Sequence, residues 1–368
     1  MRTTTHVSVA SLTTQPPLAQ GSENKWSRKP LAALLTGFLL GVLAPMAAFA
    51  QHTAGSLYFV NRTDGSEAFG YLDRDGYFQQ TQGYYYTPRP KIGTTHAVNT
   101  SNGIFLYNAN WQRMVVQIRD DGYADDFSTG FDNGGPWTDI VSVGNYLFLY
   151  NKGNGSAAIG RIGAAGYFEQ TRSYLPGLHW THVVATDNNL FFYNSTDGSA
   201  ATAFIHPSGG SMVYTQSLLP GSLPTGFSDI ISDGNYLLLF SQQTGSSLIG
   251  VIDGRPGQFR PGASVSLGAG YNKFVRHDHY LLLYDANTGR STIGYIDRTS
   301  PPQFIVTQEP AFSAGWTHIV STNDDLLFYN STDGSAAVGR IDRNGRFQQT
   351  PQVLWFSTDW SAIVPTTR

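Results

Sequence analysis

From residue 57 onward, runs of four or five apolar residues alternate with short polar segments that are rich in Gly, Asn and Asp. The most regular run reads LLFYN at 326–330. Related runs begin at residues 57, 104, 147, 190, 237, 281 and 326, so successive copies lie 43 to 47 residues apart. Self-similarity at a fixed period indicates a repeat architecture. No apolar stripe with helical spacing follows residue 50, which argues against helical repeats.

Each copy predicts four short strands separated by turns. In the last copies these are WTHIV (316–320), LLFYN (326–330), SAAVGRID (335–342) and RFQQT (346–350). Four strands in a period of this length are typical of a propeller blade. We expect the WTHIV-type strand to be the innermost strand of each blade.

The two ends of the repeat region predict that the ring is closed. The chain enters the pattern at its second strand, LYFVN (57–61), and leaves it after a seventh first strand, WSAIV (360–364). The C-terminal strand can therefore complete the N-terminal blade, which removes an exposed sheet edge. The predicted fold is all-β: a seven-bladed β-propeller of four-stranded antiparallel blades, closed by the C-terminal strand.

A small residue recurs at one position of the SAAVGRID-type strand. Glycine inside a strand marks a bulge or a close approach of backbones, and we attribute it here to the packing of neighbouring sheets. The repeat that begins at residue 104 departs from this rule, with Gln117 at the corresponding place. The other repeats have Gly70, Gly160, Ala203, Gly250, Gly294 and Gly339.

The first fifty residues have a different composition and predict a signal peptide. An extended basic region precedes the apolar run LAALLTGFLLGVLA (31–44), and Ala48-Phe49-Ala50 provides a small-x-small cleavage site. The run is short for a membrane span, which needs about 20 residues. We expect 1–50 to be removed and 51–368 to form a single secreted or periplasmic domain with no stable membrane insertion. A mis-annotated start, an uncleaved anchor and a buried helix are the alternatives.

Charge and composition exclude several functions. Removal of residues 1–50 takes away four basic residues and one acid, which leaves 19 basic against 25 acidic residues and a net charge of −6. Nucleic acid is therefore not an expected partner. The chain has no Cys, which excludes disulfides, thiolate metal sites and cysteine nucleophiles. No phosphate-binding, dinucleotide-binding or hydrolase motif is present, and we predict neither a cofactor nor a metal.

Polar and aromatic residues are predicted to gather on one face of the propeller. The loops between the second and third strands and the connections between blades emerge on the same side, which we call the top face. Aromatic planes beside amides and carboxylates suit sugars. The candidate ligand-binding residues are Trp137, Trp180, Trp316 and Trp360 at the heads of inner strands, and Asn61, Asp64, Asn194, Asp197, Asn330 and Asp333 in the NRTDG and NSTDG turns.

Each of these residues also has a structural interpretation. The Trp side chains can cap the core between blades, and Asp-Gly pairs favour ordinary hairpin turns. The third residue of the inner strand can form a catalytic ring or, more economically, hydrogen bonds between blades. Its members are His96, Asp139, His182, Asp229, Lys273, His318 and Ala362. The segments His277-Asp278-His279 and Asp73-Arg74-Asp75-Gly76 resemble parts of metal sites, but we expect both to be solvated turns.

The repeat LLFYN, GSAAVGRID, GRFQQT, GWTHIV resembles secreted β-propeller lectins of the tachylectin type and bacterial seven-bladed propeller lectins. The resemblance covers 57–364 and lacks the boxes of sialidase, WD40 and kelch propellers. It implies sugar pockets between blades or on the loop face, with Trp180, Trp316 and the Asn-Ser-Thr-Asp turns as contacts.

The predicted function is a secreted, multivalent, lectin-like carbohydrate-binding protein without catalysis, with cell-surface glycans or polysaccharides as partners. Weak sites gain avidity when they are linked in this way. An extracellular protein–protein interaction platform is the alternative, and a polysaccharide hydrolase or lyase is a further one.

Overall fold

Glycine, asparagine and aspartate divide the chain into short strands, as the repeat predicts. The computed structural model describes residues 55–84, 93–108, 110–118, 124–131, 136–174, 179–254 and 257–366. Seven sheets of four antiparallel strands are formed in this part of the chain. From the inner to the outer strand they are β4 (Thr94–Thr100), β5 (Gly103–Asn108), β6 (Gln112–Ile118) and β7 (Ala124–Phe131); β8 (Asp139–Val143), β9 (Tyr146–Tyr150), β10 (Ala157–Ile162) and β11 (Phe168–Tyr174); β12 (His182–Ala185), β13 (Leu190–Tyr193), β14 (Ala200–Ile205) and β15 (Met212–Leu218); β16 (Asp229–Asp233), β17 (Tyr236–Phe240), β18 (Ser246–Asp253) and β19 (Gln258–Ser266); β20 (Lys273–His277), β21 (Tyr280–Tyr284), β22 (Ser291–Asp297) and β23 (Gln303–Gln308); β24 (His318–Ser321), β25 (Leu326–Tyr329), β26 (Ser335–Ile341) and β27 (Phe347–Trp355); and β28 (Ala362–Thr366), β1 (Ser56–Val60), β2 (Glu67–Leu72) and β3 (Phe78–Tyr84).

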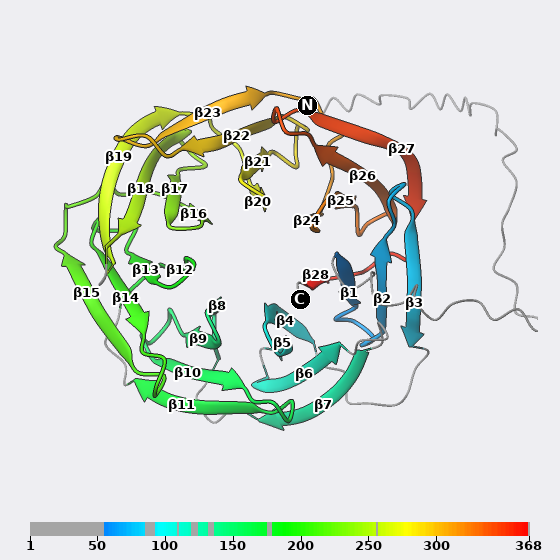
Figure 1. Cartoon of the computed structure of the whole chain (residues 1–368), viewed down its shortest axis with the longest axis horizontal. Helices are drawn as coiled ribbons and strands as arrows, with labels where there is room; N and C mark the ends of the chain where they lie inside the picture. The colour runs from blue at the N-terminus through cyan, green and yellow to red at the C-terminus, as the bar shows by residue number, and fades with distance from the viewer. Residues whose placement is uncertain are drawn as a thin grey trace, which may run out of the picture. The chain divides into compact units, whose positions relative to one another are not determined.

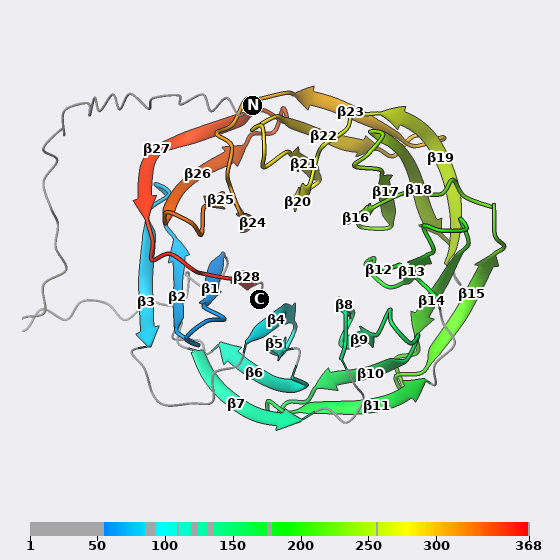
Figure 2. The same ribbon diagram turned by 180° about the vertical axis from the view of Figure 1, so that it is seen from behind.

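The sheets are arranged around a central axis, with the WTHIV-type strands nearest to it (Figures 1 and 2). In the seventh sheet, β28 from the C-terminus pairs with β1 from Ser56↔Thr366 to Val60↔Ala362. We call this sheet the closing blade. The seven-bladed fold, the antiparallel four-stranded blades and the closure by the C-terminal strand are all confirmed.

The hydrophobic core lies between adjacent blades. In β13, Leu190 and Phe192 pack against the preceding blade, whereas Phe191 and Tyr193 pack against the following one. Both faces of the strand are therefore buried, which explains why the LLFYN runs are continuously apolar instead of alternating. Burial of each such side chain stabilises the fold by about 1.5–3 kcal/mol.

The small residue in each third strand allows a phenylalanine of the same blade to pack. The ladder shifts register at this point, as between Ile159 and Gly160, which marks a bulge. A Cβ on Gly160 would lie 2.3 Å from the ring of Phe168 in the adjacent outer strand. The attribution to neighbouring sheets was therefore wrong, because the close contact lies within one blade.

In the irregular blades, a residue larger than glycine in the third strand occurs with a residue smaller than phenylalanine in the outer strand. Ala203 occurs with Met212 in place of phenylalanine. In the blade that begins at β4 the register shift lies between Val115 and Val116. Val116, and not Gln117, therefore occupies the glycine position, with Ala124 in the place of the phenylalanine.

The predicted signal peptide, residues 1–50, lies outside the described residues. Within the described ranges, no helix is long and apolar enough to cross a membrane.

Candidate functional site

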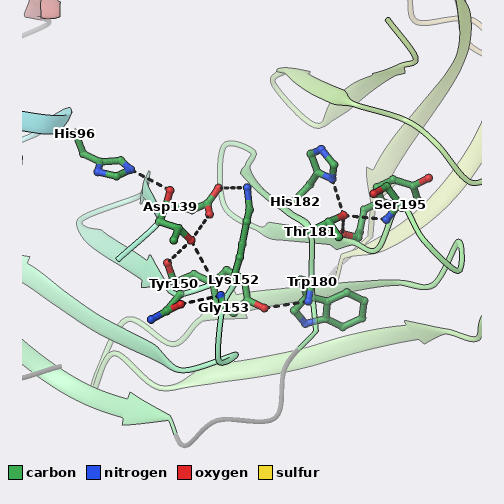
Figure 3. Close-up of polar contacts among 12 residues, drawn as sticks. His96, Asp139, Tyr150, Lys152, Gly153, Trp180, Thr181, His182 and Ser195 are labelled. Atoms are coloured by element: carbon green, nitrogen blue, oxygen red, sulfur yellow. Dashed lines mark hydrogen bonds and ion pairs between the residues drawn. The ribbon is translucent and has the colours of Figure 1, made fainter. Parts of the chain in front are cut away.

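The inner-strand histidines connect neighbouring blades. Nε2 of His96, His182 and His318 lies 3.0, 2.9 and 3.3 Å from a backbone oxygen of the next blade, contributed by Thr138, Ser228 and Ser361 respectively. Figure 3 shows the contact of His96. A carbonyl oxygen only accepts, so Nε2 carries the proton. Nδ1 of each ring lies 2.8–2.9 Å from the hydroxyl of the preceding threonine. The structural interpretation of these positions, hydrogen bonding between blades, is confirmed.

Burial of three histidines makes the free energy of unfolding depend on pH. It lowers the pKa of His182, His277 and His318 below the usual value of 6.5. Between the lowered values and 6.5 the unfolded chain binds more protons than the folded chain. The free energy of unfolding should therefore decrease as pH falls through that window, measured by urea unfolding between pH 8 and pH 5. The H182Q/H318Q double variant should show a shallower slope, and an unchanged slope would contradict the assignment.

The four predicted indoles lie at the boundary between blades. Trp137 and Trp360 are only 5% and 8% exposed, and Trp180 and Trp316 are partly buried against the inter-blade clusters. In all four cases the backbone N–H donates to the hydroxyl of a tyrosine in the preceding blade, at 2.9–3.3 Å. These tyrosines are Tyr107, Tyr150, Tyr284 and Tyr329.

Sequence reasoning missed the role of these tyrosines. The fourth residue of the LLFYN-type run is Tyr in five of the seven copies, at 107, 150, 193, 284 and 329. A hydroxyl at an otherwise apolar and fully buried position must find a partner, and that was the available signal. The tyrosine hydroxyls hold the connection that leads into the next inner strand.

The predicted turn residues first stabilise their own turns. Asn Oδ1 accepts from the backbone N–H two residues on; Asn330 accepts in this way from Thr332 at 3.0 Å. Asp Oδ1 accepts from both the N–H and the hydroxyl of a serine; Asp333 accepts from Ser335 at 2.8 and 2.6 Å. Asn61 and Asn194 repeat the first contact, and Asp64 and Asp197 repeat the second.

Two of these turns, those of Asp197 and Asp333, still leave a carboxylate oxygen for other partners. The hydrogen bonds from serine hold the pKa of Asp197 and Asp333 below the usual range, so both are ionised near neutral pH. Within the described residues, Oδ2 of Asp197 and of Asp333 accepts no hydrogen bond. The Asp197 and Asp333 turns therefore each present one charged oxygen on the top face.

Two indoles that were not predicted are the exposed ones. Trp355, at the end of β27, is 71% exposed, and Trp111, in the turn between β5 and β6, is 44% exposed. Trp355 pairs directly with Ser335 across the strands, and Ser335 is the residue bound by Asp333. Directly paired residues project from the same face of a sheet. The exposed indole and the Asp333 turn are thus adjacent on the top face.

On the opposite face, His277 differs from expectation. Its side chain is 3% exposed, and Nδ1 lies 2.9 Å from Ser321 Oγ of the next blade; it is not solvated. His279 Nδ1 instead contacts Asp278 at 2.8 Å. In the part of the chain that the structure describes, no group of three potential ligands could hold a metal ion. The Asp73–Gly76 segment is a turn, as predicted.

A cavity of about 600 Å³ opens beside this histidine. Arg276, Asp324 and Arg343 are among its lining residues. Its lining carries charges of both signs, and none of the predicted site residues contributes to it.

No family model matches the chain, and no curated protein matches it. Solved structures do. A putative 6-phosphogluconolactonase from Bacteroides fragilis is 12% identical with a TM-score of 0.63, covering 86% of this chain and 98% of that one. The periplasmic gluconolactonase PpgL of Pseudomonas aeruginosa is 14% identical with a TM-score of 0.63, covering 85% and 99%. Apo AztD from Citrobacter koseri is 12% identical with a TM-score of 0.54, covering 86% and 100%.

The chain shares their fold. At these identities the similarity extends to architecture alone. The similar structures include proteins described as lactonases and are not specifically lectins, so the comparisons support the propeller but not the lectin part of the predicted resemblance.

Proposed function

We propose that this propeller is a secreted carbohydrate-binding protein that binds glycans on its top face and does not catalyse a reaction. The observation that supports it is the pairing of the exposed Trp355 indole with the Asp333 turn through Ser335. An aromatic plane packs on the C–H face of a sugar, and a carboxylate oxygen accepts from its hydroxyls. Secretion rests on the signal peptide predicted at 1–50.

Multivalency is supported by repetition of the turn. Asp64 and Asp197 make the same two contacts to serine as Asp333, each in a different blade. We propose that the three aspartates and their partners Asn61, Asn194 and Asn330 form the polar part of each site. Trp137, Trp180, Trp316 and Trp360 then act by positioning the adjoining connections, which their burial between blades favours.

The absence of catalysis is supported by how the inner histidines are engaged. Both ring nitrogens of His96, His182 and His318 are taken up by threonine and by the backbone of the next blade. A general base needs a nitrogen within reach of a substrate proton, and these rings offer none.

Replacement of Trp355 by Ala should weaken glycan binding about tenfold, because it removes the stacking plane. A glycan array with the full chain identifies the ligand, and calorimetry then gives the affinity and the number of sites. Tyr167→Ala is the matched control, since Tyr167 is 55% exposed on the opposite face, and it should bind normally. Equal affinities for both variants, or a folded protein that binds no glycan, would contradict the proposal.

The same preparation tests the two alternatives. Incubation with lactones and polysaccharides, followed by product analysis, reports hydrolysis or lyase activity. If the protein is an interaction platform, it should retain a protein partner while remaining silent on the array.

A further inference from the structure

Two blades carry a hydrogen-bonded carboxylate at the top of the inner strand. In the first, Asp139 Oδ1 pairs with Lys152 Nζ at 2.9 Å, and Oδ2 accepts from Thr138 Oγ1 at 2.8 Å (Figure 3). In the second, Asp229 Oδ2 accepts from Gln242 Nε2 at 2.9 Å and from Ser228 Oγ at 2.7 Å. A hydroxyl and a long polar side chain thus converge on one carboxylate in each blade.

The closing blade reproduces the surroundings of this carboxylate. Arg62 follows Asn61 as Lys152 follows Asn151. The Arg62 N–H donates to Ser361 Oγ at 2.8 Å, as the Lys152 N–H donates to Thr138 Oγ1 at 2.9 Å. The histidine of the preceding blade also contacts the corresponding backbone oxygen in both cases, His318 with Ser361 and His96 with Thr138.

The closing blade lacks the carboxylate itself, because Ala362 stands where Asp139 stands in the other blade. Among the described residues, the exposed Arg62 guanidinium has a single contact, 3.5 Å from Nη2 to the Ser361 oxygen. Within the described ranges it forms no ion pair. Lys273 is the third residue of the inner strand two blades away, and within the described ranges it also has no acidic partner.

We propose that the closing blade binds a carboxylate group of the ligand at the place that the Asp139 carboxylate takes in its own blade. The Arg62 guanidinium donates to it, as Lys152 does to Asp139. Ser361 Oγ, which donates to the Val60 oxygen at 3.0 Å, turns its hydroxyl to the ligand, as Thr138 Oγ1 lies within reach of both the Tyr150 oxygen and Asp139. Arginine suits this task because its planar fork matches a carboxylate. The proposal rests on the proposed function, and it names the ligand as an acidic sugar, a uronic acid or a chain that contains one.

The exposed indoles favour a sugar over an acidic peptide. Trp355 belongs to the blade on one side of the closing blade, and Trp111 belongs to the blade on the other side. Both are on the top face, so a glycan anchored by its carboxylate at Arg62 has an aromatic plane in each adjacent blade.

NMR titration of the full chain with glucuronate and with glucose measures the two affinities and tests the site. Glucuronate should bind more tightly than glucose, and about tenfold more weakly to R62Q, which removes a charge-assisted hydrogen bond. A362D should have the same effect, because its own carboxylate would occupy the place. K152Q, whose lysine already pairs with Asp139, should bind glucuronate as the unmodified chain does.

Equal binding of glucose and glucuronate, or unchanged binding in R62Q and A362D, would overturn the site. A polyglutamate peptide that binds as tightly as an oligoglucuronate would overturn the ligand class. Loss of this site leaves the proposed function standing if the array still reports a neutral glycan that depends on Trp355. Thermal unfolding of each variant confirms that the propeller has folded.

Discussion

Deletion of residues 360–368 should leave the chain without a stable propeller. The deletion removes β28, which supplies the inner strand of the closing blade, together with the buried side chains of Trp360, Ile363 and Val364. Their burial stabilises the fold by roughly 5–8 kcal/mol in total, which is comparable with the whole stability of a typical domain. We expect loss of the cooperative thermal transition and aggregation through the uncovered edge of β1.

A shorter deletion and a peptide provide the controls. Removal of 367–368 alone keeps every residue of β28 and should leave the thermal midpoint unchanged. A synthetic peptide of residues 360–368 added to the longer truncation should restore a cooperative transition, because it can pair with β1 as a strand. A truncated chain that unfolds at the same temperature as the intact one would show that closure does not hold the ring together.

Gly334→Ala should destabilise the fold far more than Gly221→Ala. Both glycines have φ +79°, so alanine at either site incurs the left-handed penalty of about 1–2 kcal/mol. Only at Gly334 would the added Cβ meet a backbone atom, the Phe356 oxygen at 2.3 Å. The Phe356 N–H donates to the Gly334 oxygen at 2.8 Å, so the two segments cannot separate without breaking this bond. We expect about 2 kcal/mol more loss at Gly334, from steric overlap.

Urea unfolding of the two variants measures this difference directly. Gly221 has no atom within 4 Å of the added Cβ, so it isolates the effect of the backbone angle. Equal losses at the two positions would mean that the connection moves aside at no cost. The glycine of the NSTDG turn would then be needed for its backbone angle alone.

This contact explains why the turn is repeated. A Cβ at Gly198 or Gly289 would also lie 2.1 Å from a carbonyl oxygen of the connection to the next blade. From the sequence, Asn and Asp of the NSTDG turns are predicted to bind sugar, because amides and carboxylates can pair with sugar hydroxyls. In the structure, these turns first of all pack against the connection to the next blade, which crosses the top face. That role was not visible from the turn itself, because the partner segment lies about 20 residues away and varies in sequence.

Which indoles are exposed was likewise not visible from the strand or turn in which each one lies. WTHIV-type strands start with Trp at 137, 180, 316 and 360. These residues were predicted to bind sugar because they begin inner strands on the loop face, but a side chain that recurs in a closed ring meets the same neighbour each time. These positions are therefore buried between blades. Trp355 occurs once, at the end of an outer strand, and no repeat signal distinguished it.

The sequence by itself determined the number of blades, the four strands in each blade and the closure by the C-terminal strand. These follow from a period and from apolar runs, which are properties of neighbouring residues along the chain. Only the tertiary structure decided which aromatic side chains reach solvent, and only the tertiary structure showed that Arg62 contacts Ser361 while Lys152 pairs with Asp139. Such facts depend on contacts between segments up to 300 residues apart, and the ring that brings those segments together exists only when all seven blades have folded.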